Sequence, residues 1–168
     1  MELDLSAGRI WRRLTREERL AAARQFWADP ASEATPHAQA AIVKVLHVRP
    51  QAARTVPAER KAAALASVSE PSELLAASLL VALHLGLRRA LLATFLDAVG
   101  LAHDHGLLAE DGAGEPVSED AARRGVEALL AAYPPDQVRT YLNTLYLQDH
   151  GRWQALERAA AGAEGARS

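Results

Sequence analysis

The chain has 168 residues, a length that fits one domain and buries enough surface to fold without a disulfide or a structural metal. It contains no cysteine, which excludes disulfides, cysteine-ligated zinc, iron–sulfur clusters and thiol catalysis. The formal net charge of −2 provides no overall field that would attract nucleic acid or an anionic membrane.

The composition favours helices throughout. Alanine and leucine dominate, with 37 and 25 residues, and both are strong helix formers. No run of alternating β-branched and aromatic residues indicates a strand. We therefore expect an all-α fold, an irregular, orthogonal bundle of about seven or eight helices packed around one buried apolar helix. A short α-solenoid of stacked helical hairpins is the alternative.

The first half of the chain carries clear helix signals. Thr15 and Glu18 form the pattern of a capping box, which predicts a helix that starts there and stops before Pro30. A second helix is expected to start at Thr35 and to run to about Arg49, because Pro50 disfavours helical geometry in the residue before it.

The middle of the chain, from Leu74 to Leu101, is the most apolar stretch. Its first fourteen residues carry no charge, and a helix that is apolar on all sides must be surrounded by other elements. A membrane span needs about twenty such residues, so the pattern indicates the buried central helix of the bundle. Whether Leu74–Gly100 forms one helix or two stays open, because Gly86 and the Arg88-Arg89 pair interrupt it.

The second half begins with a glycine-rich loop over residues 101–117. Ser118 predicts the start of the next helix, which ends at Tyr133 before two prolines, and one more strong helix follows. We expect residues 1–158 to form a single domain and residues 159–168 to be a frayed or disordered tail.

The sharpest chemical feature is His103-Asp104-His105. Two imidazoles and a carboxylate within three residues suit a divalent metal such as zinc, manganese or iron, with further ligands drawn from Glu110, Asp111 or His150. No other cofactor is expected. The alternative is an exposed loop in which one of these side chains caps a neighbouring helix.

The stretch LAHDHGLL resembles the His-Asp segment of the HD-domain metal-dependent phosphohydrolases, which are all-α. The resemblance implies a metal-dependent hydrolase, in which His103 and Asp104 supply the dyad, His84 an upstream ligand and Asp149 a downstream one. This chain departs from the pattern in two ways. The dyad lies between two glycines rather than on a helix, and the gap back to His84 is short.

Three residues of the apolar stretch are candidates for binding. His84 lies among leucines, where it is either a hydrogen-bonded core histidine or a contact that lines a pocket. Arg88 and Arg89 form either a solvated corner between helices or an anchor for an acidic partner, since arginine binds carboxylates in a bidentate manner.

We predict a cytoplasmic, non-enzymatic interaction or adaptor module that binds another protein or a second copy of itself. The chain offers no convergent set of acid, base and nucleophile. Tyrosine and tryptophan are enriched at interface centres, so Tyr141, Tyr146 and Trp153 are expected to form the contact face. The alternatives are the metal-dependent hydrolase at His103–His105, and a module that binds a small ligand or nucleic acid.

Overall fold

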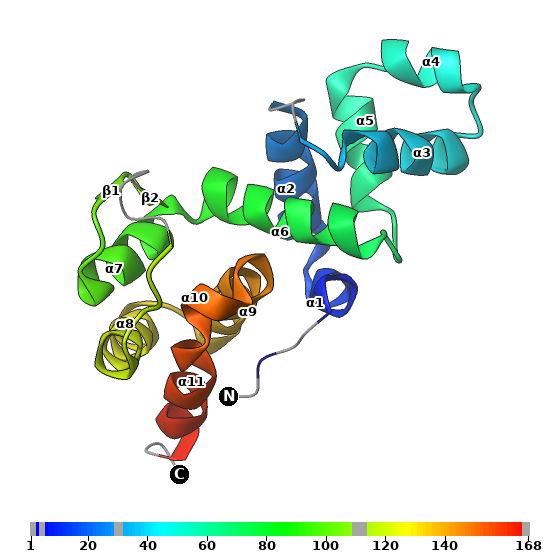
Figure 1. Ribbon diagram of the computed structural model, residues 1–168. Helices are drawn as coiled ribbons and strands as arrows, with labels where there is room; N and C mark the ends of the chain where they lie inside the picture. The colour runs from blue at the N-terminus through cyan, green and yellow to red at the C-terminus, as the bar shows by residue number, and fades with distance from the viewer. Residues whose placement is uncertain (1–2, 4–5, 29–31, 109–113, 166–168) are drawn as a thin grey trace. The chain divides into compact units, whose positions relative to one another are not determined.

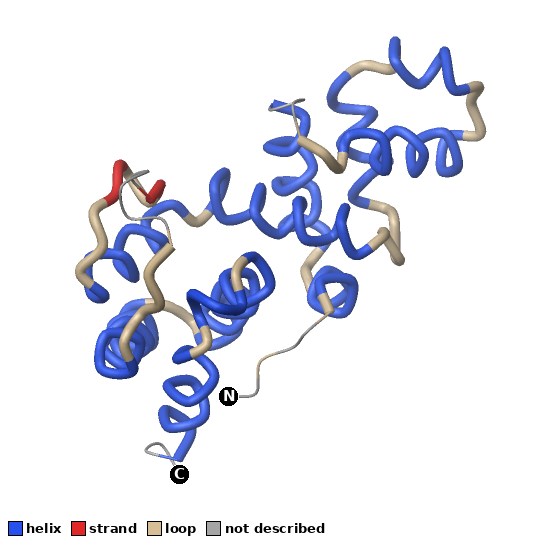
Figure 2. The backbone as a smooth tube through the Cα atoms, viewed as in Figure 1, coloured by secondary structure: helices blue, strands red, loops and turns tan. Residues whose placement is uncertain are grey.

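The computed structural model describes residue 3 and residues 6–28, 32–108 and 114–165, and most of these residues are helical (Figure 1, Figure 2). The predicted all-α fold is confirmed: eleven helices and one two-stranded hairpin form within the described ranges. The helices outnumber the prediction because several of them are short and are separated by single residues.

Contacts within the chain divide it into two compact units. We call Ser6–Leu87 the N-terminal unit, and Arg88–Ser168 together with Met1–Leu5 the C-terminal unit. The prediction of one domain over residues 1–158 stays a prediction. The N-terminal unit contains α1 (Ala7–Arg13), α2 (Arg16–Ala28), α3 (Thr35–Leu46), α4 (Pro50–Thr55), α5 (Ala58–Ala66) and α6 (Glu73–Leu87). The C-terminal unit contains α7 (Arg89–Val99), β1 (His103–Asp104), β2 (Leu107–Leu108), α8 (Glu119–Ala132), α9 (Pro135–Gln148), α10 (His150–Trp153) and α11 (Ala155–Gly165).

Helix boundaries in the N-terminal unit follow the capping signals closely. The Glu18 amide donates to the Thr15 hydroxyl at 3.2 Å, and the Thr15 amide donates to the Glu18 carboxylate at 2.8 Å, which is the predicted capping box. The helix expected to reach Arg49 instead ends at Leu46. His47 then takes a left-handed conformation with φ of 52°, which ends the helix before Pro50 is reached.

The apolar stretch forms two helices, α6 and α7, which settles the open question about Leu74–Gly100. Helix α6 packs against α1, α2 and α3, and Leu75, Leu79 and Leu83 are fully buried. Within the described ranges, no single helix is long and apolar enough to cross a membrane; α6 and α7 meet the length and hydropathy of a span only when taken together across their break.

The core of the C-terminal unit forms around Phe95 of α7. Its ring makes an edge contact with Tyr141 of α9 at 5.5 Å and a tilted contact with Trp153 of α10 at 5.7 Å, measured between ring centroids. Helix α8 approaches the same ring at Gly125, where an added Cβ would lie 2.5 Å from the Phe95 ring. Only glycine therefore allows α7 and α8 to pack this closely.

The stretch expected to be a frayed tail is helical as far as Gly165, since it forms most of α11. Ala160 is fully buried, and α11 packs along α8. The packing along α8 holds the helix in place, and the pattern of alanines alone did not indicate a partner. Residues 166–168 of the expected tail lie outside the described residues.

Candidate functional site

The His103-Asp104-His105 segment forms a tight hairpin. Strand β1 pairs antiparallel with β2, with His103 opposite Leu108. The turn between them uses positive φ at His105 and Gly106, of 46° and 86°. At Gly106 a Cβ would lie 2.8 Å from the Cβ of Leu92, so glycine is required by packing as well as by backbone conformation.

Both ring nitrogens of His103 are engaged within this hairpin. The Gly106 amide donates to Nδ1 at 3.1 Å, so Nδ1 is unprotonated and the proton lies on Nε2. Nε2 then donates to the Asp97 carboxylate at 3.0 Å. A metal ion at His103 would have to displace one of these partners. The geometry gives His103 a structural role, because it ties the turn to the end of α7.

The remaining predicted ligands do not assemble with it in the part of the chain that the structure describes. No group of three His, Asp or Glu side chains there is placed to hold a metal ion. Asp104 and His105 are exposed neighbours 3.7 Å apart, and His150 contacts the Tyr146 hydroxyl at 3.2 Å. Glu110 and Asp111 lie outside the described residues.

The resemblance to the HD-domain hydrolases finds no support in the local geometry. The dyad of His103 and Asp104 lies on a β-hairpin, whereas that family carries it on a helix. Asp149 caps α10 by accepting a hydrogen bond from the Arg152 amide at 3.0 Å. His84 lies in the other unit, buried in the last turn of α6. His103 and Asp149 therefore make local structural hydrogen bonds, and His84 is not placed beside them as a third ligand.

The two arginines of the predicted anchor are in different environments. Arg88 is only 7% exposed and lies at the break between α6 and α7, where its carbonyl accepts from the amides of Leu91 and Leu92. Arg89 is exposed in the first turn of α7. The structure does not present the pair as one basic anchor, because only Arg89 faces water.

The aromatic residues predicted as a contact face are core residues instead. Tyr141, Tyr146 and Trp153 are each no more than 3% exposed, so they are not available to a partner. Burial raises the pKa of Tyr141 well above its usual value. Burial, followed by the charge of Glu157 and a hydrogen bond to it, also raises the pKa of Tyr146. The prediction rested on residue type, and tyrosine and tryptophan are common both in buried cores and at the centres of interfaces.

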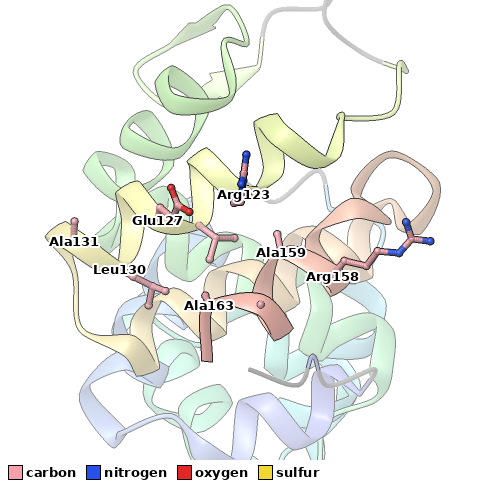
Figure 3. Close-up of a pocket in the computed structure, with 9 residues that line it drawn as sticks. Arg123, Glu127, Leu130, Ala131, Arg158, Ala159 and Ala163 are labelled. Carbon is pink, nitrogen blue, oxygen red and sulfur yellow. The ribbon is translucent and has the colours of Figure 1, made fainter. Parts of the chain in front are cut away.

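An open surface lies on another side of the C-terminal unit, between α8 and α11. A groove of about 410 Å³ runs between these two helices (Figure 3). In Figure 3 the side chains of Leu130 and Ala163 lie between the helices, and Arg158 extends from α11 at the edge. We call this surface the α8–α11 groove; it is lined by Arg123, Val126, Glu127, Leu130, Ala131, Arg158, Ala159, Gly162 and Ala163.

The floor of the α8–α11 groove is apolar, and its charges are confined to the rim. Val126 is fully buried at the base, and Leu130, Ala159 and Ala163 are half-buried. On the rim, Arg158 pairs with Glu119, and Arg123 pairs with Asp120 at 2.9 Å. Apart from these two ion pairs and the carboxylate of Glu127, the described lining of the groove is aliphatic carbon and helix backbone.

Glu127 differs from the other charged residues of the rim. Its carboxylate is exposed and makes no hydrogen bond or ion pair with any described residue. It lies one helical turn after Arg123, and the two side chains leave α8 on the same side in Figure 3. The rim therefore displays adjacent charges of opposite sign beside an apolar floor.

Sequence reasoning missed this groove because half of it belongs to the expected tail. The signal was present as small residues at spacings of three and four, Ala159, Gly162 and Ala163, which share one face of a helix. Such a face forms a groove only when it lies opposite Val126 and Leu130 of α8, about 35 residues earlier in the chain. The contact between α8 and α11 was not predictable from either segment.

A second cleft, of about 400 Å³, lies in the N-terminal unit between α2 and α5. Arg16 and Arg19 line it, together with Ser67 at the end of α5. The carboxyl end of a helix carries partial negative charge, which attracts these arginines and disfavours a bound anion beside them. Arg19 already donates to the Arg12 carbonyl at 2.8 Å, and this cleft is the weaker candidate.

Comparison with known proteins provides no further guidance. No protein-family model, no curated protein and no solved structure gives a significant match to this chain.

Proposed function

We propose that this chain is a non-enzymatic protein-interaction module, and that its docking surface is the α8–α11 groove. The occupant that suits this surface is the apolar face of a helix. The observation that carries the proposal is an open groove with an apolar floor and a charged rim, which is the arrangement of a helix-binding site. We also infer a cytoplasmic location, which the cysteine-free composition supports.

The chemistry of the lining favours a helix over a small molecule. A small-molecule site of this size orients its ligand with a few polar groups that converge inside the cavity. Here the floor residues Val126, Leu130 and Ala159 offer no side-chain donor or acceptor. The charged residues Arg123, Glu127 and Arg158 lie on the rim, where they would contact the polar edges of an amphipathic helix.

Gly162 supports the same interpretation. Glycine inside a helix costs about 0.5–1 kcal/mol relative to alanine, so an interior glycine needs a compensating role. A Cβ added at Gly162 would meet no atom within 4 Å, and packing within the described chain does not require glycine there. Its bare backbone lies on the groove surface, where another backbone can approach closely.

Site-specific photo-crosslinking in the cells that make this protein tests the proposal. Ala131 is exposed and lines the groove, whereas Ala132 is exposed and does not line it. Replacing each in turn by p-benzoylphenylalanine gives a matched pair of probes on consecutive residues of α8. Adducts are then sequenced by mass spectrometry to identify the peptide that is joined to the probe.

The proposal predicts an adduct from Ala131 whose partner peptide belongs to an amphipathic helix, and a yield several times lower from Ala132. Equal labelling from both positions, a non-protein adduct, or no adduct from Ala131 would refute it. Circular dichroism of both variants checks that helix content is unchanged.

A further inference from the structure

We infer that the occupant of the α8–α11 groove is the same face of a second copy of this chain, so that two copies pair about a two-fold axis. This inference rests on the proposed function and names its partner. Two-fold dimers are the commonest closed assemblies, and their interface must be complementary to itself. The rim of the groove meets that requirement.

The charge pattern on α8 is self-complementary. Arg123 and Glu127 are one turn apart and leave the helix on the same side (Figure 3). When two copies of α8 cross in antiparallel directions, with the axis midway between these residues, Arg123 of each copy faces Glu127 of the other. One two-fold axis therefore creates two ion pairs from two residues.

The contacts that Arg123 and Glu127 make within one chain leave both side chains available for ion pairs with a second copy. Glu127 makes no hydrogen bond or ion pair with any residue that the structure describes. Among the described side chains, Arg123 is held only by Asp120, at 2.9 Å, and both side chains are more than 60% exposed. Exposed pairs of this kind are weak, so Arg123 can contact Glu127 of a second copy while remaining near Asp120.

The same pairing covers apolar surface that lies beside these charges. Leu130 follows Glu127 along α8, and Ala131 adjoins it at the exposed edge of the groove. A foreign helix would have to supply its own basic and acidic residues at matching positions. A second copy already carries both in the correct order, which is why the charge pattern favours it as the occupant.

Charge reversal in solution tests the pairing. Sedimentation velocity of the full chain, over a concentration series at low salt, should show a reversible dimer that weakens as salt is added. R123E and E127R should each weaken the dimer by about tenfold or more, because each variant places two like-charge pairs across the axis. An equimolar mixture of the two variants should restore dimers, since every facing pair is then Glu with Arg.

Matched controls separate this effect from net charge. Arg60 of α5 and Glu115 before α8 are exposed and lie outside the groove, so R60E and E115R carry the same charge changes. Both should dimerise like the unmodified chain. Circular dichroism melts confirm that all variants fold.

Three results would overturn the inference: an unmodified chain that stays monomeric at millimolar concentration, controls that weaken the dimer equally, or a mixture that does not restore it. The photo-crosslinking result then separates the two proposals. A monomeric chain whose Ala131 adduct maps to a helix of another protein refutes the second copy and leaves the proposed function standing. A monomeric chain with no helical adduct refutes both.

Discussion

Helix α8 has two contacts of opposite character. On the side of α7 it packs so closely that a Cβ at Gly125 would overlap the Phe95 ring, which lies inside the core. On the side of α11 it leaves a groove of about 410 Å³, and a Cβ at Gly162 would meet nothing within 4 Å. Glycine thus occurs at both contacts: at Gly125 the chain fills the space beside it, and at Gly162 the space stays open.

The comparison teaches how a surface for a partner differs from a core. At the α7 contact, the ring of Phe95 occupies the space that the missing side chain of Gly125 leaves. At the α11 contact, small residues leave space that no described side chain fills. The proposed function is supported by this difference, because two well-formed helices leave space between them that a partner can fill.

The largest loss of stability is expected when the contact between α7 and α8, which we call the closed contact, loses its central ring. Phe95→Ala removes a fully buried ring that contacts Tyr141 and Trp153, and should lower the free energy of unfolding by about 3–5 kcal/mol. Urea denaturation followed by circular dichroism measures it. A loss below 1 kcal/mol would show that the ring does not organise this unit.

Overfilling the same contact should have the next largest effect. Gly125→Ala places a methyl group 2.5 Å from the Phe95 ring, and should lower the free energy of unfolding by about 2–3 kcal/mol. In a Phe95→Leu background the loss should be smaller, because the leucine side chain lacks the ring edge. Identical losses in both backgrounds would contradict a direct clash between these two residues.

Alkaline pH tests whether the closed contact excludes water. Burial raises the pKa of Tyr141 above the value of about 10 that it has in the unfolded chain. Below pH 10 the hydroxyl is protonated in both states, so stability is unaffected. Above pH 10 the unfolded chain gains free energy by ionising, and stability should fall by about 1.4 kcal/mol per pH unit for this group.

Tyr141→Phe should make that fall shallower without abolishing it, because the raised pKa of Tyr146 acts in the same direction. The measurement is the midpoint of urea unfolding between pH 8 and pH 11, a range set around the tyrosine pKa. An unchanged slope in the variant would show that the Tyr141 hydroxyl is solvated in the folded state.

The smallest change in stability, and one of opposite sign, is expected at the contact between α8 and α11, which we call the open contact. Gly162→Ala should stabilise the chain by about 0.5–1 kcal/mol, because alanine favours the helix and its methyl group meets no atom of the described chain. Thermal unfolding at low protein concentration measures this, with Gly125→Ala as the opposing case. A loss of stability would mean that the groove is already filled.

Much of the fold could be predicted from residues that act locally. Thr15 and Glu18 specify a helix start through bonds between residues three apart, and Ser118 starts α8 in the same way. The all-α class followed from the alanine and leucine content. The candidate site was not predictable, because Gly162 and Leu130 become neighbours only when α11 packs along α8.

The sequence by itself therefore determined the all-α class and the starts of several helices, among them α2, α3 and α8, since propensity and capping act over a few residues. Only the tertiary structure decided that Tyr141 and Trp153 are core residues, that His103 closes a hairpin, and that a groove remains open beside α8. These outcomes depend on which helix faces meet, and a single helix carries no information about the face that will cover it.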